Sequence, residues 1–314
     1  MTRLDRATLL HLGVIAALFA LSFVLPDYHH GVVARVLVLA TFATGYNLLF
    51  GYAGLLSLGH AMFFAAGMYG VGLVMVHLQW PALPALLAGI AVGAVLSAIV
   101  GVLALRTTGV AFMIVTMMFA QVLYLTIIYF NNWTGGDQGL VIPQQARQIA
   151  GLDLFQPTTR YMLALALFSV VLLVTLALVR SSYGRVLVAI RENEERTRML
   201  GYDTFANKLA AVVVSGTICA AAGAAYALLF GHVGANFAGV QYSILPLLWV
   251  LTGGAATTLG PLVGTLFMQY AIDITSGVTT AWLLVVGVAL ILLILFFPRG
   301  LLGSIRQRWL RWLP

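Results

Sequence analysis

Long apolar segments recur along this chain, and they constrain its fold more than any other feature. Runs that can cross a membrane occupy residues 7–25, 32–50, 57–78, 82–105, 108–130, 161–179, 209–231 and 280–297. A bilayer core about 30 Å thick requires about 20 such residues per helix. Only 8% of the residues are charged, whereas an ordinary soluble domain has about 25%. The sequence therefore predicts an all-α, polytopic transmembrane helical bundle that forms a single domain over residues 1–314.

The first apolar run also has features of a secretory signal peptide, because Arg3 and Arg6 precede it and small residues lie near its end. Residues 7–25 are nevertheless longer than the apolar part of a signal peptide, which has about 7 to 15 residues. We therefore expect this run to be an uncleaved first helix.

A further apolar region, residues 244–275, has too many residues for one helix. Thr252, Gly253 and Gly254 interrupt it, and Gly260 with Pro261 interrupts it again. Glycine and proline are tolerated at such depths where the freed backbone groups find other partners. The region is therefore either one interrupted helix or two short helices.

The distribution of basic residues favours two helices, since cytoplasmic loops of membrane proteins are rich in Lys and Arg. If the N-terminus is cytoplasmic, the basic segment 180–208 is cytoplasmic as well. The arginine-rich tail after Phe297 should also be inside, which requires an odd number of crossings after the loop at 232–243. Three crossings fit, whereas two would place the tail outside. We therefore predict about ten helices with both termini in the cytoplasm. Of the 16 Lys and Arg residues, 13 are then inside and three are outside, namely Arg35, Arg147 and Arg160.

The segment 180–208 is the one long polar stretch of the chain and must lie in water. Its motif RENEERTR contains two Glu–Arg pairs spaced four residues apart, Glu192 with Arg196 and Glu194 with Arg198. This spacing stabilises a solvated helix by about 0.2–0.5 kcal/mol per pair. We expect one helix between Gly184 and Gly201, with Gly201 at a C-cap that needs positive φ. The segment is either a solvated connection or a helix that a soluble partner binds.

Several classes of function lack support in the sequence. Charged residues are almost absent from the middle of the apolar runs, so neither a proton relay nor gating charges are indicated. The chain contains no GxxxxGK[ST] motif, so any ATP must be bound by another chain. Its net charge of +7 comes from arginines scattered at the ends of apolar runs, which does not indicate nucleic-acid binding. The single cysteine, Cys219, supports neither a disulfide nor a metal cluster.

The stretch from Gly45 to Gly72 contains seven glycines among 28 mostly apolar residues. Each glycine costs about 1 kcal/mol of helix propensity relative to alanine. In a membrane such glycines either let helices pack closely or break a helix and free backbone groups for a substrate. Asn47, Ser57 and His60 add hydrogen-bonding groups to this stretch and favour a substrate path. A lone histidine without nearby Cys or Asp does not indicate a metal site.

These stretches together resemble a known family. GYAGLLSLGHAMFFAAGMYG is similar to the glycine-rich signature of permease subunits of branched-chain amino acid ABC importers, in particular the second permease, or M subunit. Further stretches agree in order: RTTGVAFMIVTMMFAQV, NNWTGGDQGL, AIRENEERTRMLGYDTFANKL, SILPLLWVLTGGAATTLGPLVGTLF and FPRGLLG. Urea and short-chain amide permeases share these signatures, as do relatives that carry other small hydrophobic acids. His60 stands where members commonly carry Gln, and the run after Thr252 is looser than the usual GGxG.

The resemblance implies an importer in the bacterial inner membrane with a second homologous permease, two cytoplasmic ATPases that bind ATP, and a soluble binding protein. It implies no catalytic residue, metal or cofactor in this chain. The loop matching RENEERTRMLG then docks on an ATPase, and its coupling residues are Arg191, Glu192, Asn193, Glu195, Arg196 and Gly201. Candidates for the substrate path are Asn47, Ser57, His60 and Thr252, with Thr116 and Gln121 as weaker additions. A passive channel or facilitator is the alternative, because it would also have uncharged spans.

Overall fold

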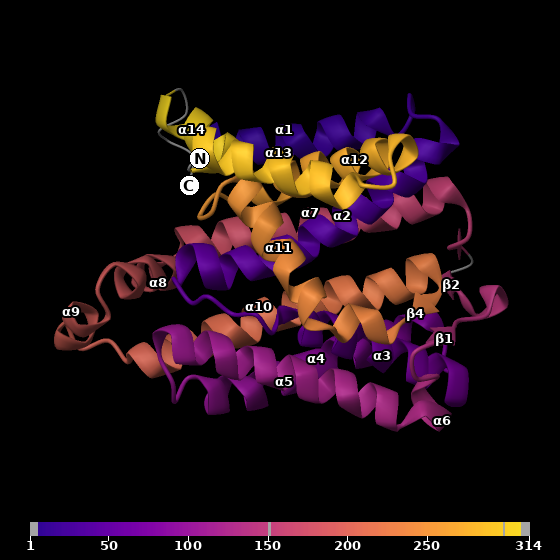
Figure 1. Ribbon diagram of the computed structural model, residues 1–314, viewed down its shortest axis with the longest axis horizontal. Helices are drawn as coiled ribbons and strands as arrows, with labels where there is room; N and C mark the ends of the chain where they lie inside the picture. The colour runs from indigo at the N-terminus through magenta and orange to yellow at the C-terminus, as the bar shows by residue number, and fades with distance from the viewer. Residues whose placement is uncertain (1–5, 150–151, 298, 309–314) are drawn as a thin grey trace, which may run out of the picture.

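The computed structural model describes residues 6–149, 152–297 and 299–308 and shows a helical bundle (Figure 1). The predicted apolar segments correspond to the helices α1 (Arg6–Leu21), α2 (Asp27–Asn47), α3 (His60–His77), α4 (Ala82–Ala104), α5 (Gly109–Tyr129), α7 (Pro157–Arg180), α10 (Thr204–Phe230), α11 (Val240–Gly253), α12 (Gly260–Val278) and α13 (Trp282–Phe296). Six of these, α2, α3, α4, α5, α7 and α10, are long and apolar enough to cross a membrane. The prediction of an all-α membrane bundle is confirmed.

Residues 244–275 form parts of two helices, α11 and α12, rather than one interrupted helix. Helix α11 contains Pro246 and has only 14 residues, which corresponds to about 21 Å at a rise of about 1.5 Å per residue. It is therefore shorter than the bilayer core. The backbone between the two helices lies among other helices, where its polar groups can be paired.

Shorter elements cluster at the two ends of the bundle. One end, which we name the loop end, carries α8 (Ser182–Glu192), α9 (Glu194–Met199) and α14 (Gly300–Arg308) (Figure 1). The opposite end, named the strand end, carries α6 (Asn131–Thr134), the 3-10 turn η2 (Gln144–Ala146), and the strands β1 (Leu140–Val141), β2 (Gln148–Ile149), β3 (Leu152–Asp153) and β4 (His232–Val233). A further 3-10 turn, η3 (Ala235–Ala238), precedes α11. Strands β1 and β4 pair antiparallel, and so do β2 and β3.

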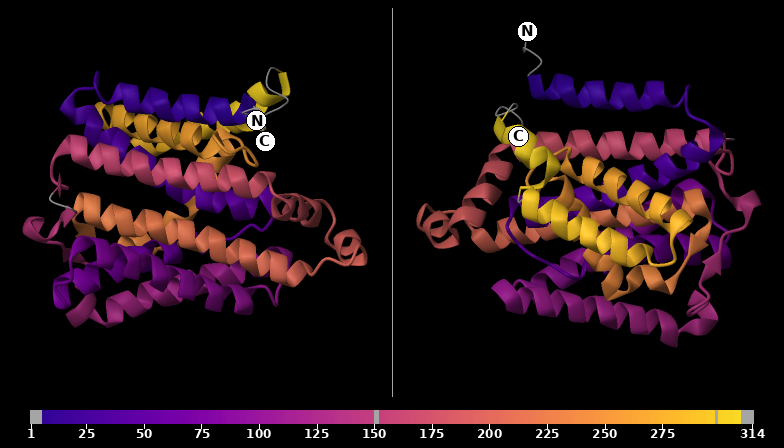
Figure 2. Two further views of the ribbon diagram at one scale, coloured as in Figure 1. Left: turned by 180° about the vertical axis from the view of Figure 1, so that it is seen from behind. Right: turned by 45° about the horizontal axis from the view of Figure 1, so that its top comes forward.

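The first turn of α1 and helix α14 lie at the same end of the bundle as α8 and α9 in both views (Figures 1 and 2). This placement agrees with the odd number of crossings predicted after the loop at 232–243. Which end faces the cytoplasm stays a prediction from charge.

Helices α3, α4 and α10 form the most tightly packed part of the core. A Cβ at Gly67 of α3 would overlap the Ala220 carbonyl, and a Cβ at Gly223 of α10 would overlap the Phe64 carbonyl. Close approach of backbones through small residues is the usual packing mode of membrane helices. The glycines of α3 therefore serve packing, as does Gly45 of α2, where a Cβ would lie 2.8 Å from Cys219 Sγ. Gly51, Gly54 and Gly59 belong to the break described below.

We expect Gly223→Ala to destabilise the protein by about 1–3 kcal/mol or more, because the facing backbone cannot yield as a side chain would. Gly13→Ala is the matched control, since a Cβ there meets nothing within 4 Å, and it should leave stability unchanged or slightly raised. The stability of both variants is measured as the midpoint of thermal unfolding in detergent, from the fraction that still elutes as folded protein after heating. Equal midpoints for the two variants would contradict this account of the core.

Candidate functional site

The glycine-rich stretch breaks the chain between α2 and α3. Helix α2 continues into a π-helical turn, η1 (Leu48–Tyr52), and α3 starts only at His60. Gly54 has φ +72°, a conformation that glycine adopts without steric cost. We name residues 48–59 the first break. A π-helical turn often marks a functional position in a helix.

A second break, residues 254–259, separates α11 from α12. Gly254 has φ +119° and Ala256 has φ +56°, so the chain reverses sharply there. The prediction of two glycine-interrupted regions near the core is therefore confirmed.

Asn47 joins the two breaks. Its side-chain Nδ2 donates to the Thr257 carbonyl at 2.9 Å, and its Oδ1 accepts from the Ala256 N–H at 3.0 Å. Asn47 is 1% exposed, so these bonds satisfy backbone groups that would otherwise be buried without partners. Asn47 thus acts as a clamp between segments more than 200 residues apart in sequence.

His60 and Ser57 belong to one buried hydrogen-bond chain. The Ser215 hydroxyl donates to the Gly45 carbonyl at 2.6 Å, so the 2.9 Å contact with His60 must use a proton on His60 Nε2. In a neutral imidazole the other nitrogen accepts, and the Ser57 hydroxyl therefore donates to His60 Nδ1 at 3.1 Å. Ser57 Oγ in turn accepts from the Gly59 N–H at 3.2 Å.

The remaining candidates for the substrate path lie at different distances from this hydrogen-bond network. The Thr116 hydroxyl of α5 accepts from the Leu58 N–H at 3.3 Å, so Thr116 contacts the first break directly. Gln121 is half-buried farther along α5. Thr252 is fully buried in the last turn of α11, and its hydroxyl has no hydrogen-bond partner among the described residues. Four of the six candidates, Asn47, Ser57, His60 and Thr116, therefore meet at or beside the first break.

Sequence analysis missed three hydroxyl residues of this network. Ser215 holds His60, Ser243 accepts from the Ala61 N–H at 3.0 Å, and Thr257 supplies the carbonyl bound by Asn47. Small polar residues inside apolar helices were the available signal for Ser215 and Ser243.

The polar segment forms two helices rather than the one predicted. Asn193 has φ −159° and ψ 103° and separates α8 from α9. Its Oδ1 accepts from the Arg196 N–H at 2.8 Å, which is the bond of a helix N-cap. The predicted continuous helix was therefore wrong, because a local side-chain cap competes successfully with the helical conformation there.

The two predicted ion pairs of this segment have different outcomes. Glu194 and Arg198 both lie in α9 and approach to 3.6 Å. Glu192 and Arg196 are separated by the break at Asn193, and no ion pair joins them in the described part of the chain. Gly201 has φ +90° and its N–H donates to the Arg198 carbonyl at 2.9 Å, which confirms the predicted positive-φ C-cap.

Arg191 connects the polar segment to the first break. Its Nη1 donates to the Gly51 carbonyl within the π-helical turn. A Cβ at Gly54 would lie 2.7 Å from Arg191 Cγ, so the arginine stem lies directly on the positive-φ glycine. All six predicted coupling residues are exposed, Gly201 among them. Arg191 is the member of this set whose side chain bonds the break among the described residues.

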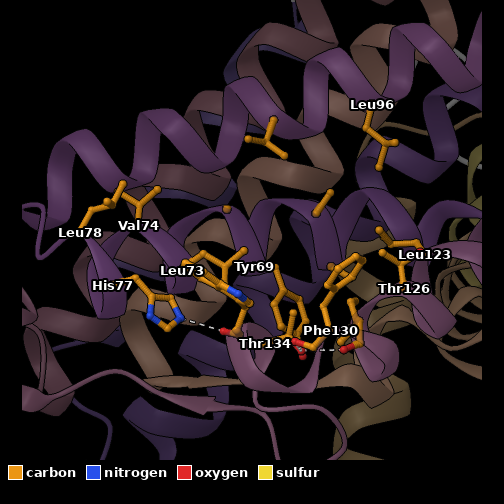
Figure 3. Close-up of a pocket in the computed structure, with 16 residues that line it drawn as sticks. Tyr69, Leu73, Val74, His77, Leu78, Leu96, Leu123, Thr126, Phe130 and Thr134 are labelled. Carbon is orange, nitrogen blue, oxygen red and sulfur yellow. Dashed lines mark hydrogen bonds between the residues drawn. The ribbon is translucent and has the colours of Figure 1, made fainter.

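An apolar groove of about 730 Å³ lies elsewhere, between α3, α4 and α5 (Figure 3). At its end, His77 bonds the Trp133 carbonyl at 2.8 Å. None of the predicted path residues lines this groove. It adjoins the outward faces of α4 and α5, which are largely exposed in the bundle.

Glu194 and Lys208 provide a pH test of the polar segment. Burial alone would raise the pKa of Glu194, but the hydrogen bond and charge of Lys208, 2.6 Å away, outweigh it and the pKa is lowered. Stabilisation by this carboxylate is therefore present above its ordinary pKa, 4.5, and is lost as pH falls through the lower folded value. We expect the proteolytic resistance of residues 180–208 to fall below about pH 4.5 in the wild type.

In Glu194→Gln the loss of proteolytic resistance on acidification should be much smaller than in the wild type. The resistance of this variant should already be lower than that of the wild type at pH 7. Glu192→Gln is the control, because Glu192 is exposed and should behave as the wild type. The same acid transition in all three proteins would contradict the assignment.

Residues 29–295 match the family described as branched-chain amino acid transport system / permease component. The high-affinity branched-chain amino acid transport system permease protein LivM of Salmonella typhimurium is 27% identical over 289 residues, covering 84% of this chain and 67% of that protein. LivM of Escherichia coli K12 is 27% identical over 290 residues, with the same coverage. A probable LivM of Methanocaldococcus jannaschii is 26% identical over 204 residues, covering 60% of this chain and 59% of that protein.

No solved structure matches the chain. The family match covers most of the sequence and includes both breaks and the polar segment between Arg180 and Lys208. The chain is a multi-pass membrane protein that belongs to the family of branched-chain amino acid transport system permease components.

Proposed function

We propose that this chain is the membrane-spanning permease subunit of an ATP-driven importer for branched-chain and other hydrophobic amino acids. The observation that carries the proposal is the hydrogen bond from Arg191 to the Gly51 carbonyl. It ties an exposed, charged pair of helices to a buried break in the bundle. A partner that moves α8 would therefore move the backbone of the first break, and this is the mechanical link that coupled transport requires.

The proposed partners are two ATPase subunits at the loop end, a second homologous permease beside this one, and a soluble binding protein at the strand end. The proposed location is the bacterial inner membrane with the loop end in the cytoplasm, in agreement with the basic residues gathered there. ATP is bound by the partner subunits, and this chain supplies the docking surface and the path.

The walls around the first break are predominantly apolar with a few hydroxyl, amide and imidazole groups. They suit a small zwitterionic or uncharged molecule with an apolar tail, which includes branched-chain amino acids as well as short-chain amides. A passive channel would not require the docking helices. Co-purification of an ATPase with this chain distinguishes an importer from a channel.

Charge reversal on the docking surface tests the coupling. Glu195 and Arg196 are exposed, and neither side chain bonds another described residue, so Glu195→Arg and Arg196→Glu should leave folding and insertion nearly unchanged. We expect each variant to lose most stimulation of ATP hydrolysis by substrate-loaded binding protein. Arg106→Glu, at an exposed turn between α4 and α5, is the control. Normal uptake and normal stimulation in both docking variants would refute the docking role.

Two small substitutions test the path. Ser57→Ala and His60→Gln add little or no volume but remove members of the hydrogen-bond chain at the first break. We expect at least one to change the apparent KM or the substrate preference several-fold while the complex assembles normally. Ser97→Ala is the control, since Ser97 is equally buried in α4 away from the break. If both variants match the wild type and only bulky residues at Gly54 or Gly59 impair assembly, the stretch is a packing seam.

A further inference from the structure

The three arginines that the predicted topology places outside converge on the C-terminal end of α10. Arg35 and Arg160 lie over the Phe230 ring, with Cζ atoms 5.5 and 5.3 Å from its centroid. Arg147 packs on the next residue, Gly231, where a Cβ would lie 2.7 Å from its Cζ. Guanidinium groups from α2, from the loop before β2 and from α7 therefore meet at two consecutive residues, although they are far apart in sequence.

No ion pair joins these guanidinium groups to a carboxylate within the residues that the structure describes, and several of their nitrogens are unpaired. Arg147 is only 7% exposed, yet its Nε and Nη1 have no hydrogen-bond partner there. Arg160 Nε is also unpartnered, and Arg160 Nη2 makes one long bond, 3.4 Å, to the Phe155 carbonyl. Asp153 acts on Arg147 electrostatically but forms no ion pair with it, and its carboxylate accepts from the Phe155 N–H at 2.9 Å.

Such a cluster is unfavourable by itself. The charges of Arg35 and Arg147 both act on Arg160, and buried cations without partners are costly. The Phe230 ring and the C-terminal dipole of α10 offset part of this cost. They leave Nε and Nη1 of Arg147 and Nε of Arg160 without a hydrogen-bond partner among the described residues, and guanidinium N–H groups match the two oxygens of a carboxylate.

Aromatic rings continue from this cluster toward the breaks. Successive ring centroids are 4.6 to 6.4 Å apart along the series Phe230, Tyr226, Phe237, Tyr242, Phe42 and Trp249. Phe42 precedes Asn47 on α2 by five residues, and Trp249 lies one turn before the second break. An apolar tail attached to a carboxylate at the arginines would therefore lie against aromatic side chains.

We propose that Arg35, Arg147 and Arg160 form a carboxylate-binding site at the strand end of the bundle, for a small organic acid with an apolar tail. The site deepens the proposed function, on which it rests, because it receives the carboxylate of the substrate as it enters the bundle. It selects carboxylates over neutral amides and urea, which offer no negative charge to the arginines.

Isocaproate and isocaproamide test the site, since they share one tail and differ in charge. Binding is measured calorimetrically on the assembled permease and ATPase complex in phosphatidylcholine nanodiscs, without ATP and without binding protein. We expect isocaproate to bind the wild type at least about tenfold more tightly than isocaproamide, as charge-assisted hydrogen bonds require. Arg147→Gln and Arg35→Gln should each weaken isocaproate binding about tenfold and leave isocaproamide binding unchanged.

Arg35→Gln keeps the test valid if the buried Arg147→Gln does not fold, because Arg35 is exposed. Arg106→Gln, at the loop end, is the matched control and should bind as the wild type. Equal binding of the two probes, no isocaproate binding, or wild-type binding by the folded arginine variants would overturn the proposal.

Two further results would also overturn the proposal, because each assigns the arginines to another source of negative charge. Loss of binding-protein docking in Arg35→Gln, with no isocaproate binding by the wild type, assigns the arginines to acidic side chains of that protein. If phosphatidylglycerol added to the nanodiscs stabilises the protein and isocaproate does not compete with this effect, the arginines bind lipid phosphate. ATP-driven uptake of leucine is measured separately, so intact uptake without isocaproate binding refutes only this site. Intact isocaproate binding without ATP-driven uptake refutes only the proposed function.

Discussion

Pairing of backbone polar groups inside the bundle is the constraint on which the rest of the structure depends. A helix that is broken at membrane depth leaves N–H and C=O groups that no water can satisfy. Here side chains from other elements take them: Asn47 binds the backbone of Ala256 and Thr257, and Ser243 accepts from Ala61. The two breaks are therefore compatible with a membrane only because they are held together.

The need to pair backbone groups also explains why the polar segment, residues 180–208, contacts the bundle at the first break. Arg191 donates to the Gly51 carbonyl in the π-helical turn, so a residue of a water-exposed helix completes a buried break. Glu194 and Lys208 fix the other side of that segment to the start of α10. These contacts attach the polar segment both to the first break and to α10. A displacement of α8 would therefore act directly on the backbone of the break.

The arginines show how topology and chemistry combine. Basic residues favour the loop end, from which we predict that this end faces the cytoplasm, and Arg35, Arg147 and Arg160 instead meet around Phe230 and Gly231. Scattered exceptions would be ordinary variation. Their convergence, with unpartnered nitrogens on Arg147 and Arg160, places three positive charges around two consecutive residues of the chain. Beside it, the aromatic series provides apolar surface, and the combination suits an amphiphilic anion.

The sequence alone determined the place of the apolar helices, the two glycine breaks and the positive-φ cap at Gly201, because length, composition and backbone sterics are local properties. It predicted one helix in the polar segment where Asn193 divides two, since the gain from a side-chain cap depends on the final geometry. Tertiary structure alone decided that Asn47 clamps the second break, that Ser215 orients His60 and that three distant arginines meet. Those contacts join residues far apart in sequence, and several use backbone groups that every residue carries, so no local pattern can identify the partner.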